Sequence, residues 1–149
     1  MPLPARTPDV VKRNAELMQK LDGRMPYMAN LGFRLLETDF GHARFRLPCG
    51  GASAGDDGGL AAGALLSAVD HAGSLAAWLT MEFGNPEWFG STVNTKLMIY
   101  EPAIAEDVIV DAVAEGANGS LIHSRVAITT EAGIPVASGN TIYRIIRRG

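Results

Sequence analysis

One carboxylate in this chain is surrounded by apolar residues. Asp70 lies near the middle of the longest apolar stretch, residues 58–81, which reads GGLAAGALLSAVDHAGSLAAWLTM. Moving an ionised carboxylate from water into such surroundings is costly unless the group is paired or hydrogen-bonded. We therefore interpret Asp70 as a functional residue with the chemistry of a general base or a nucleophile.

Small and polar residues share one face of the helix that this stretch predicts. Gly63, Ser67, Asp70 and Ser74 follow one another at spacings of four, three and four, which places them on one side of an α-helix. We predict that a substrate lies along this stripe. The alternative is that the stripe is a close helix contact in which Ser67 and Ser74 only satisfy Asp70 by hydrogen bonds.

Two other patterns point to different chemistry. Residues 51–55, GASAG, match the G-x-S-x-G motif, which needs a strand directly before Ser53 and a helix directly after it. Pro48 interrupts any strand and residues 56–59 delay the helix, so a serine hydrolase is disfavoured.

The three histidines have no metal-ligand spacing, and we expect no metal site. His71 points about 100° away from Asp70 around the helix, which favours a packed or interface histidine.

Capping and turn signals define the elements that position these residues. Thr7 and Pro8 begin a helix that ends near Gly23. Strands are expected over residues 32–38, 42–47, 91–100, 107–114, 121–130 and 135–147. The turns at 116–119 and 131–133 are too short for anything but antiparallel hairpins.

These elements predict an α+β fold in which a curled antiparallel sheet wraps around one long central helix. We expect a single domain over residues 1–149, with an N-terminal helical flank over 1–31 and a core over 32–149. A helix that is apolar nearly all round must be covered on every side. The sheet leaves one side open, so we expect a second copy of the chain to cover it.

Composition restricts the partners and the compartment. The 149 residues include 13 Lys and Arg against 16 Asp and Glu, a net charge of -3, and no basic block is longer than residues 147–148. A nucleic-acid partner is therefore not expected. Asp70 disfavours a membrane span over 58–81. The single cysteine and an N-terminus without the pattern of a secretory signal favour a cytoplasmic protein.

Several segments together resemble the hotdog-fold acyl-CoA thioesterases of the phenylacetate-degradation type. These are the glycine-rich loop, the alanine-rich helix with an acid at its centre, the segment TVNTKLMIYEPA at 92–103, and the last strand, which begins with GIPVASGNTIYRI. The resemblance covers residues 32–146. It implies hydrolysis of an acyl-CoA thioester by dimers or tetramers, with coenzyme A as part of the substrate and no other cofactor.

The chain departs from the family pattern at two positions. Where relatives begin the helix with His-Gly-Gly, this sequence has Ala61, Ala62 and Gly63, and a family Asn or Gln falls on Gly55. The resemblance implies that the amides of Ala62 and Gly63 hold the oxyanion and that Thr92 orients the acid or the water. Because these donors are main-chain groups, a change of side chain need not remove them.

Helix geometry indicates that two chains form each site. Eight residues separate Ala62 from Asp70, about 12 Å along a helix, whereas both groups must reach one carbonyl. Two antiparallel helices related by a two-fold axis would bring Asp70 of one chain opposite Ala62 of the other. The sequence thus predicts a homo-oligomeric acyl-CoA thioesterase. The alternatives are a non-catalytic protein that binds acyl thioesters, and a hydratase or dehydratase acting on them.

Overall fold

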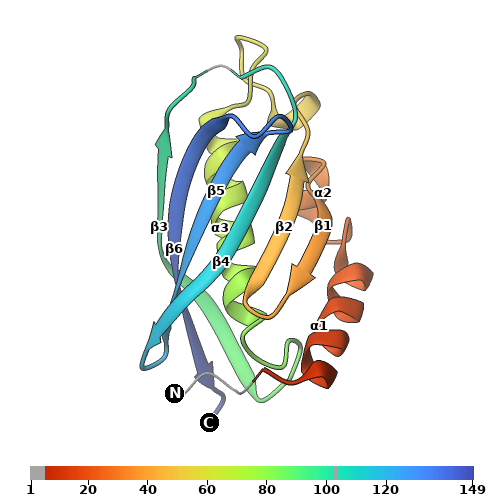
Figure 1. The fold of residues 1–149 in the computed structure, drawn as a ribbon, viewed down its shortest axis with the longest axis vertical. Coiled ribbons are helices and arrows are strands. Elements are labelled where there is room, and N and C mark those ends of the chain that lie inside the picture. Colours follow the sequence, from red (N-terminus) through yellow and green to blue (C-terminus); the bar gives the residue numbers. More distant parts are fainter. Residues whose placement is uncertain (1–5, 103) are drawn as a thin grey trace.

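A six-stranded antiparallel sheet curves around one long helix (Figure 1). The computed structural model describes residues 6–102 and 104–149. The elements are α1 (Pro8–Leu21), α2 (Pro26–Asn30), β1 (Arg34–Asp39), β2 (His42–Leu47), a 3-10 turn (Gly51–Ser53), α3 (Ala62–Trp78), β3 (Trp88–Ile99), β4 (Val108–Asn118), β5 (Leu121–Thr130) and β6 (Pro135–Arg147). The strand order is β1-β2-β4-β5-β6-β3, with every neighbouring pair antiparallel. The expected fold, a curled sheet around a central helix, is confirmed.

Most of the predicted boundaries agree with the structure. Thr7 caps α1, accepting a hydrogen bond on its hydroxyl from the Val10 N–H at 3.4 Å. The strands β5 and β6 have the expected bounds. The β4 strand runs four residues further than predicted, through Asn118, so the hairpin turn lies at Gly119 and Ser120, where Gly119 has a φ of 61°. The last residue of the 92–103 motif, Ala103, lies outside the described residues.

One element was not predicted. The five-residue helix α2 begins at Pro26, whose fixed φ suits the first position of a helix. Five residues are too few to show a helical period of apolar positions, so the sequence contained no periodic signal for α2. This short helix proves to be part of the candidate site.

Close packing sets the position of α3 against β6. A Cβ added at Gly73 would lie 2.5 Å from the Thr141 hydroxyl oxygen, so only glycine allows this approach. The same hydroxyl donates a hydrogen bond to the Val69 carbonyl at 3.1 Å. Val69 and Thr141 are fully buried. Because Asp70 follows Val69 directly, these contacts also hold Asp70 at a defined height along the sheet.

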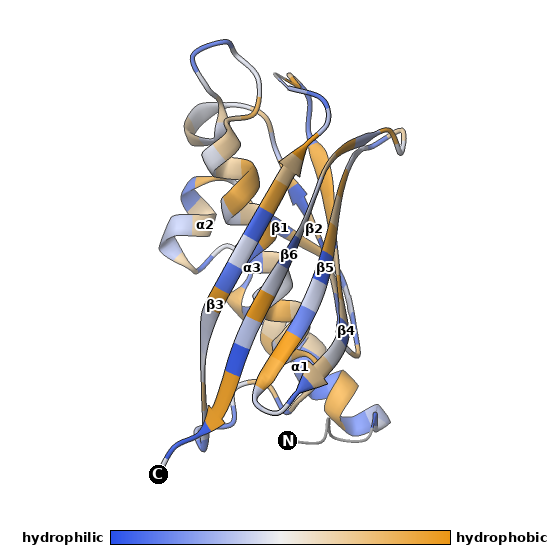
Figure 2. Cartoon of the chain, turned by 90° about the vertical axis from the view of Figure 1, so that its left-hand side faces the viewer, coloured by the Kyte–Doolittle hydropathy of each residue, from blue (hydrophilic) through white to orange (hydrophobic). Residues whose placement is uncertain are grey.

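The sheet leaves one face of α3 open, as expected. Leu66 is 41% exposed although it lies within the apolar helix, and Ser67, Asp70 and Ser74 are half-buried on the same face. The neighbouring strand β3 is at the edge of the sheet, and Figure 2 shows hydrophobic segments on it that alternate with hydrophilic ones. Its Val93 and Met98 are 48% and 63% exposed. A helix face that exposes Leu66 and a sheet edge that exposes Val93 and Met98 are therefore both uncovered.

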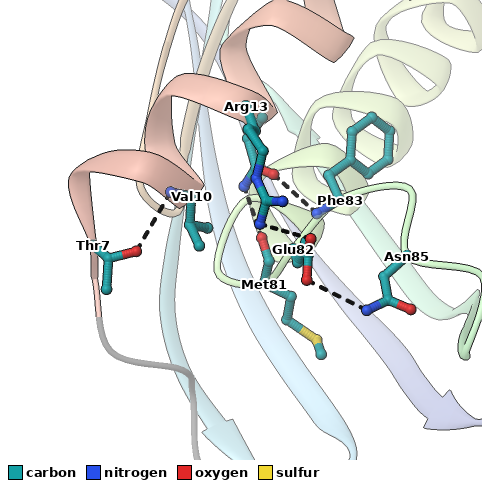
Figure 3. A network of polar contacts seen from close by, with 8 residues as sticks. Thr7, Val10, Arg13, Met81, Glu82, Phe83 and Asn85 are labelled. Carbon is teal, nitrogen blue, oxygen red and sulfur yellow. Dashed lines mark hydrogen bonds and ion pairs between the residues drawn. The ribbon is translucent and has the colours of Figure 1, made fainter.

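The helix α1 is tied to the segment that follows α3 (Figure 3). Buried Asn14 donates from its side-chain amide to the Met81 carbonyl at 2.7 Å and accepts from the Phe83 N–H at 2.9 Å. Exposed Arg13 pairs with Glu82 at 2.7 Å. Of the helices described, none has both the length and the hydropathy to cross a bilayer.

Candidate active site

Asp70 is held by two threonine hydroxyls from β3. Thr92 donates to Asp70 Oδ1 at 2.8 Å, and Thr95 donates to the same oxygen at 3.0 Å. In the described part of the chain no group donates to Asp70 Oδ2. One carboxylate oxygen is thus anchored, and the other is left for a ligand or a water molecule.

A β-bulge brings both threonines to the same carboxylate. Side chains alternate between the two faces of a regular strand, so residues 92 and 95 would point to opposite faces. Thr92 pairs with Tyr143 and Asn94 pairs with Ile142, which makes Val93 an extra residue in β3. The extra residue reverses the alternation. Thr92 was predicted to be a site residue, but Thr95 was missed, because the sequence does not mark the bulge.

The two serines of the predicted stripe have other partners. Ser67 donates to the Gly63 carbonyl at 2.8 Å and lies 2.8 Å from the hydroxyl of Tyr27 on α2. Ser74 approaches the Thr92 hydroxyl at 3.4 Å. Neither serine hydrogen-bonds to Asp70 among the residues described, so the interpretation that they only satisfy the carboxylate is wrong.

The first turn of α3 has free main-chain donors. The N–H groups of Ala62 and Gly63 donate to no acceptor within residues 6–102 and 104–149, and Ala61 provides no side-chain cap. Both residues are exposed, and a Cβ built on Gly63 would meet nothing within 4 Å. Such free amides, at the positive end of a helix dipole, are suited to a developing negative charge.

A cleft of about 450 Å³ lies next to these amides. Its lining includes the apolar residues Leu60 and Ile99 and the acidic residues Asp56, Asp57 and Glu101. Asp57 accepts a hydrogen bond from the Gly59 N–H at 2.9 Å and so stabilises the loop itself.

Ser53 of the G-x-S-x-G sequence does not reach the cleft next to the α3 amides. It is fully buried and donates to the carbonyl of Pro48. It also lies in a 3-10 turn and not between a strand and a helix. Ser53 therefore stabilises the loop. The sequence context had already disfavoured a nucleophilic serine at this position.

A second cleft, of about 300 Å³, lies directly at Asp70. It is lined by Met25, Pro26, Tyr27, Met28, Ser67, Asp70 and His71. The first four residues come from α2 and the residue before it, and the last three come from α3. The open face of the central helix therefore has a small, mainly apolar cavity beside its carboxylate.

His71 is packed against two aromatic rings. Its imidazole lies 5.4 Å from the Phe33 ring and 5.9 Å from the Phe45 ring, measured between centroids. Burial lowers the pKa of His71 to about 4, although the charge of Asp70 acts in the opposite direction. The ring is neutral at pH 7. The expectation of a packed histidine is met, and His71 does not act as a charged partner of Asp70.

The residues described contain no group of three His, Cys, Asp or Glu side chains that could hold a metal ion. The groups that this site offers for chemistry are the carboxylate, the hydroxyl groups and the free amides. Together they place a carboxylate beside a cleft, while the free amides of the same helix lie about two turns away.

Comparison with known proteins identifies structural relatives. Neither a protein-family model nor a curated protein sequence matches this chain. A thioesterase family protein from Silicibacter pomeroyi superposes with a TM-score of 0.79 at 22% identity, covering 91% of this chain and 99% of that one. A thioesterase from Haemophilus influenzae superposes with a TM-score of 0.78 at 15% identity, covering 97% of this chain and 94% of that one.

A third relative comes from the phenylacetic acid degradation operon of E. coli. It superposes with a TM-score of 0.75 at 16% identity and covers 95% of both chains. At these identities the likeness concerns the arrangement of the backbone. The chain therefore has the hotdog fold found in structures of the thioesterase superfamily, the fold that the sequence resemblance implied.

Proposed function

We propose that this protein is an acyl-CoA thioesterase in which Asp70 is the general base or the nucleophile. The observation that carries the proposal is the way in which the Asp70 carboxylate is hydrogen-bonded and placed. Oδ1 is fixed by two hydroxyl donors, Oδ2 has no donor among the described residues, and the group lines a cleft. The fold that the chain shares with proteins described as thioesterases supports this assignment.

The reaction can follow two routes from this arrangement. As a base, Asp70 takes a proton from water, and the hydroxide adds to the thioester carbonyl carbon. The tetrahedral intermediate then breaks the carbon–sulfur bond, and the coenzyme A thiolate leaves and is protonated. As a nucleophile, Asp70 adds to the carbonyl itself, and the intermediate breaks the carbon–sulfur bond, releasing the coenzyme A thiolate, which is protonated, and leaving an anhydride. Water then hydrolyses the anhydride to the free acid and the Asp70 carboxylate. In both routes the oxyanion needs donors, which we assign to the Ala62 and Gly63 amides.

We propose that these donors come from a second copy of the chain. Ala62 and Asp70 of one helix lie too far apart to serve a single carbonyl. The uncovered face of α3 around Leu66 and the exposed apolar edge of β3 support pairing with another protomer. In a two-fold dimer each Asp70 would face the α3 N-terminus of its partner, and two equivalent sites would form.

The direct test measures release of free thiol from a panel of acyl-CoA esters, with the wild-type protein and Asp70→Asn. We expect the variant to lose about 100- to 10,000-fold in kcat, the usual contribution of a positioned base. Asp9→Asn, on the exposed first turn of α1, is the matched control and retains activity. Full hydrolysis by Asp70→Asn would remove the carboxylate from the mechanism.

The absence of the family histidine gives a second candidate, a protein that binds acyl thioesters without hydrolysing them. Ala61 occupies the position of that histidine. Binding of acyl-CoA by the wild type without thiol release would support this alternative. A hydratase or dehydratase would need a histidine paired with the acid, and His71, which is packed against Phe33 and Phe45, has no hydrogen bond to Asp70 in the described residues.

A further inference from the structure

Two cavities meet at one layer of side chains. The open cleft beside Asp70 and a smaller, partly enclosed cavity of about 10 Å³ both have Met25, Met28 and His71 in their linings. The rest of the smaller cavity is lined mainly by apolar residues, among them Leu21, Phe33, Phe45 and Leu75, and also by Asp22. A volume of about 10 Å³ is at the limit for a single water molecule. The three shared residues therefore form a wall between the cleft and the hydrophobic core.

The cleft is suited to an uncharged apolar group. Met25, Met28 and Pro26 contribute hydrocarbon and thioether surface, and the neutral ring of His71 continues it. Asp70 is the one charged side chain in the lining, and it would repel an acid at the end of a bound chain. The volume of about 300 Å³ is at the lower end for small-molecule sites. These properties indicate a short apolar occupant.

The other cleft is less suitable for such a group. The lining at the α3 N-terminus carries the carboxylates of Asp56, Asp57 and Glu101. Carboxylates in water lose solvation when an apolar chain covers them, which opposes binding. Of the two clefts next to the open face of α3, the one beside Asp70 offers the surface that an apolar chain would bury.

We propose that the acyl group of the substrate lies in the cleft between α2 and α3, and that Met25, Met28 and His71 limit its length. This inference rests on the proposed thioesterase function and extends it to the substrate class, short uncharged acyl groups. Asp70 in the lining of the cleft marks the position of the thioester. The residues that the cleft shares with the inner cavity limit the number of carbons that can follow it.

The wall consists of side chains that can be shortened individually. Met28 is 7% exposed and is part of the main core cluster, whereas Met25 is half-buried and packs at the edge of that cluster. Removing either thioether, or the His71 ring, would connect the cleft with the space in front of Phe33 and Phe45. A longer acyl chain could then extend past the cleft and pack against the apolar side chains of Phe33 and Phe45.

The test compares kcat/KM for straight-chain acyl-CoA esters of roughly two to twelve carbons in wild type, Met25→Ala, Met28→Ala and His71→Ala. In an apolar pocket, one methylene more or fewer on the substrate changes kcat/KM by about 10-fold or more. We expect the longest accepted chain to increase by two or more carbons in the variants. Met81→Ala is the matched control, because Met81 is a buried methionine of the separate second cluster. It should lower the melting temperature and keep the wild-type length profile.

A second measurement separates this inference from the proposed function. Non-hydrolysable thioether analogues of the same chain lengths are titrated into each protein by calorimetry. If wild type releases no thiol but the variants bind longer analogues than wild type, the thioesterase proposal fails. The proposal that Met25, Met28 and His71 limit the chain length is then supported. If folded Met25→Ala and His71→Ala keep the wild-type length profile in both assays, or if no analogue binds, the proposal that these side chains limit the chain length is refuted.

Discussion

At the scale of single residues, the candidate site depends on how Asp70 is held. Two hydroxyl groups donate to one of its oxygens, from positions in β3 that only a bulge places on the same face. A hydrogen bond to a charged group contributes about 1.5 to 3 kcal/mol. The threonines therefore fix the orientation of the carboxylate.

The variants Thr92→Val and Thr95→Val test this role. Valine keeps the shape of threonine and removes the donor, so each variant should lower kcat by about 10- to 100-fold while KM changes little. Thr92→Ser and Thr95→Ser retain a hydroxyl and should restore most of the activity. Full activity in the valine variants together with a loss in the serine variants would show that the methyl group, and not the hydrogen bond, matters.

The packed imidazole of His71 predicts a pH dependence of stability. Its pKa is about 4 in the folded protein and 6.5 in the unfolded reference, so between these values the unfolded chain binds more protons. The free energy of unfolding should therefore decrease as the pH falls from 6.5 to about 4. Urea titrations of wild type and His71→Leu at several pH values measure this. The variant should lose less stability over that interval, and parallel curves would contradict the assignment.

At the scale of elements, the position of α3 against β6 depends on a glycine. Gly73→Ala would bring a methyl group to 2.5 Å from the Thr141 hydroxyl oxygen, and such overpacking costs about 1 to 3 kcal/mol. Thermal unfolding should show this loss, and activity should fall because Asp70 lies one turn away. Gly63→Ala in the same helix is the control for stability. Its added Cβ meets nothing within 4 Å, and we expect no destabilisation.

The attachment of α1 depends on Asn14 more than on the ion pair beside it (Figure 3). Asn14→Ala leaves the Met81 carbonyl and the Phe83 N–H without their partner, which costs about 1 to 3 kcal/mol for each group that stays buried. Arg13→Ala removes an exposed pair with Glu82 that contributes about 0 to 1 kcal/mol. Chemical denaturation of both variants should give this order, and the reverse order would contradict it.

At the scale of the whole molecule, the two-chain site can be tested by mixing inactive variants. Ala62→Pro removes one oxyanion donor at the first position of α3, where proline is tolerated and the preceding residue is already extended. Asp70→Asn removes the base. If each site combines groups from two chains, refolding an equal mixture forms mixed dimers with one complete site each. Activity should return to about one quarter of the wild-type value.

The pure variants, refolded separately, serve as the controls for this mixture and should remain inactive. Circular dichroism establishes that Ala62→Pro is folded, and sedimentation shows whether both variants assemble. No recovery in a mixture of folded, assembled variants would place the base and the oxyanion donors in one chain.

Local physics made much of this protein predictable from its sequence. The apolar stretch indicated a buried helix with Asp70 at its centre, and the short turns allowed only hairpins, because these signals depend on neighbouring residues. The contact of Thr92 with Asp70 was anticipated through the family resemblance and is present.

Only the tertiary structure decided how distant segments meet. Thr95 joins Asp70 because an extra residue at Val93 changes the strand register, and register is settled by pairing with β6. The cleft exists because α2 packs beside α3, so that Tyr27 reaches Ser67, 40 residues away in the chain. Contacts of this kind arise from packing that no local pattern encodes, and they determine which groups face the carboxylate.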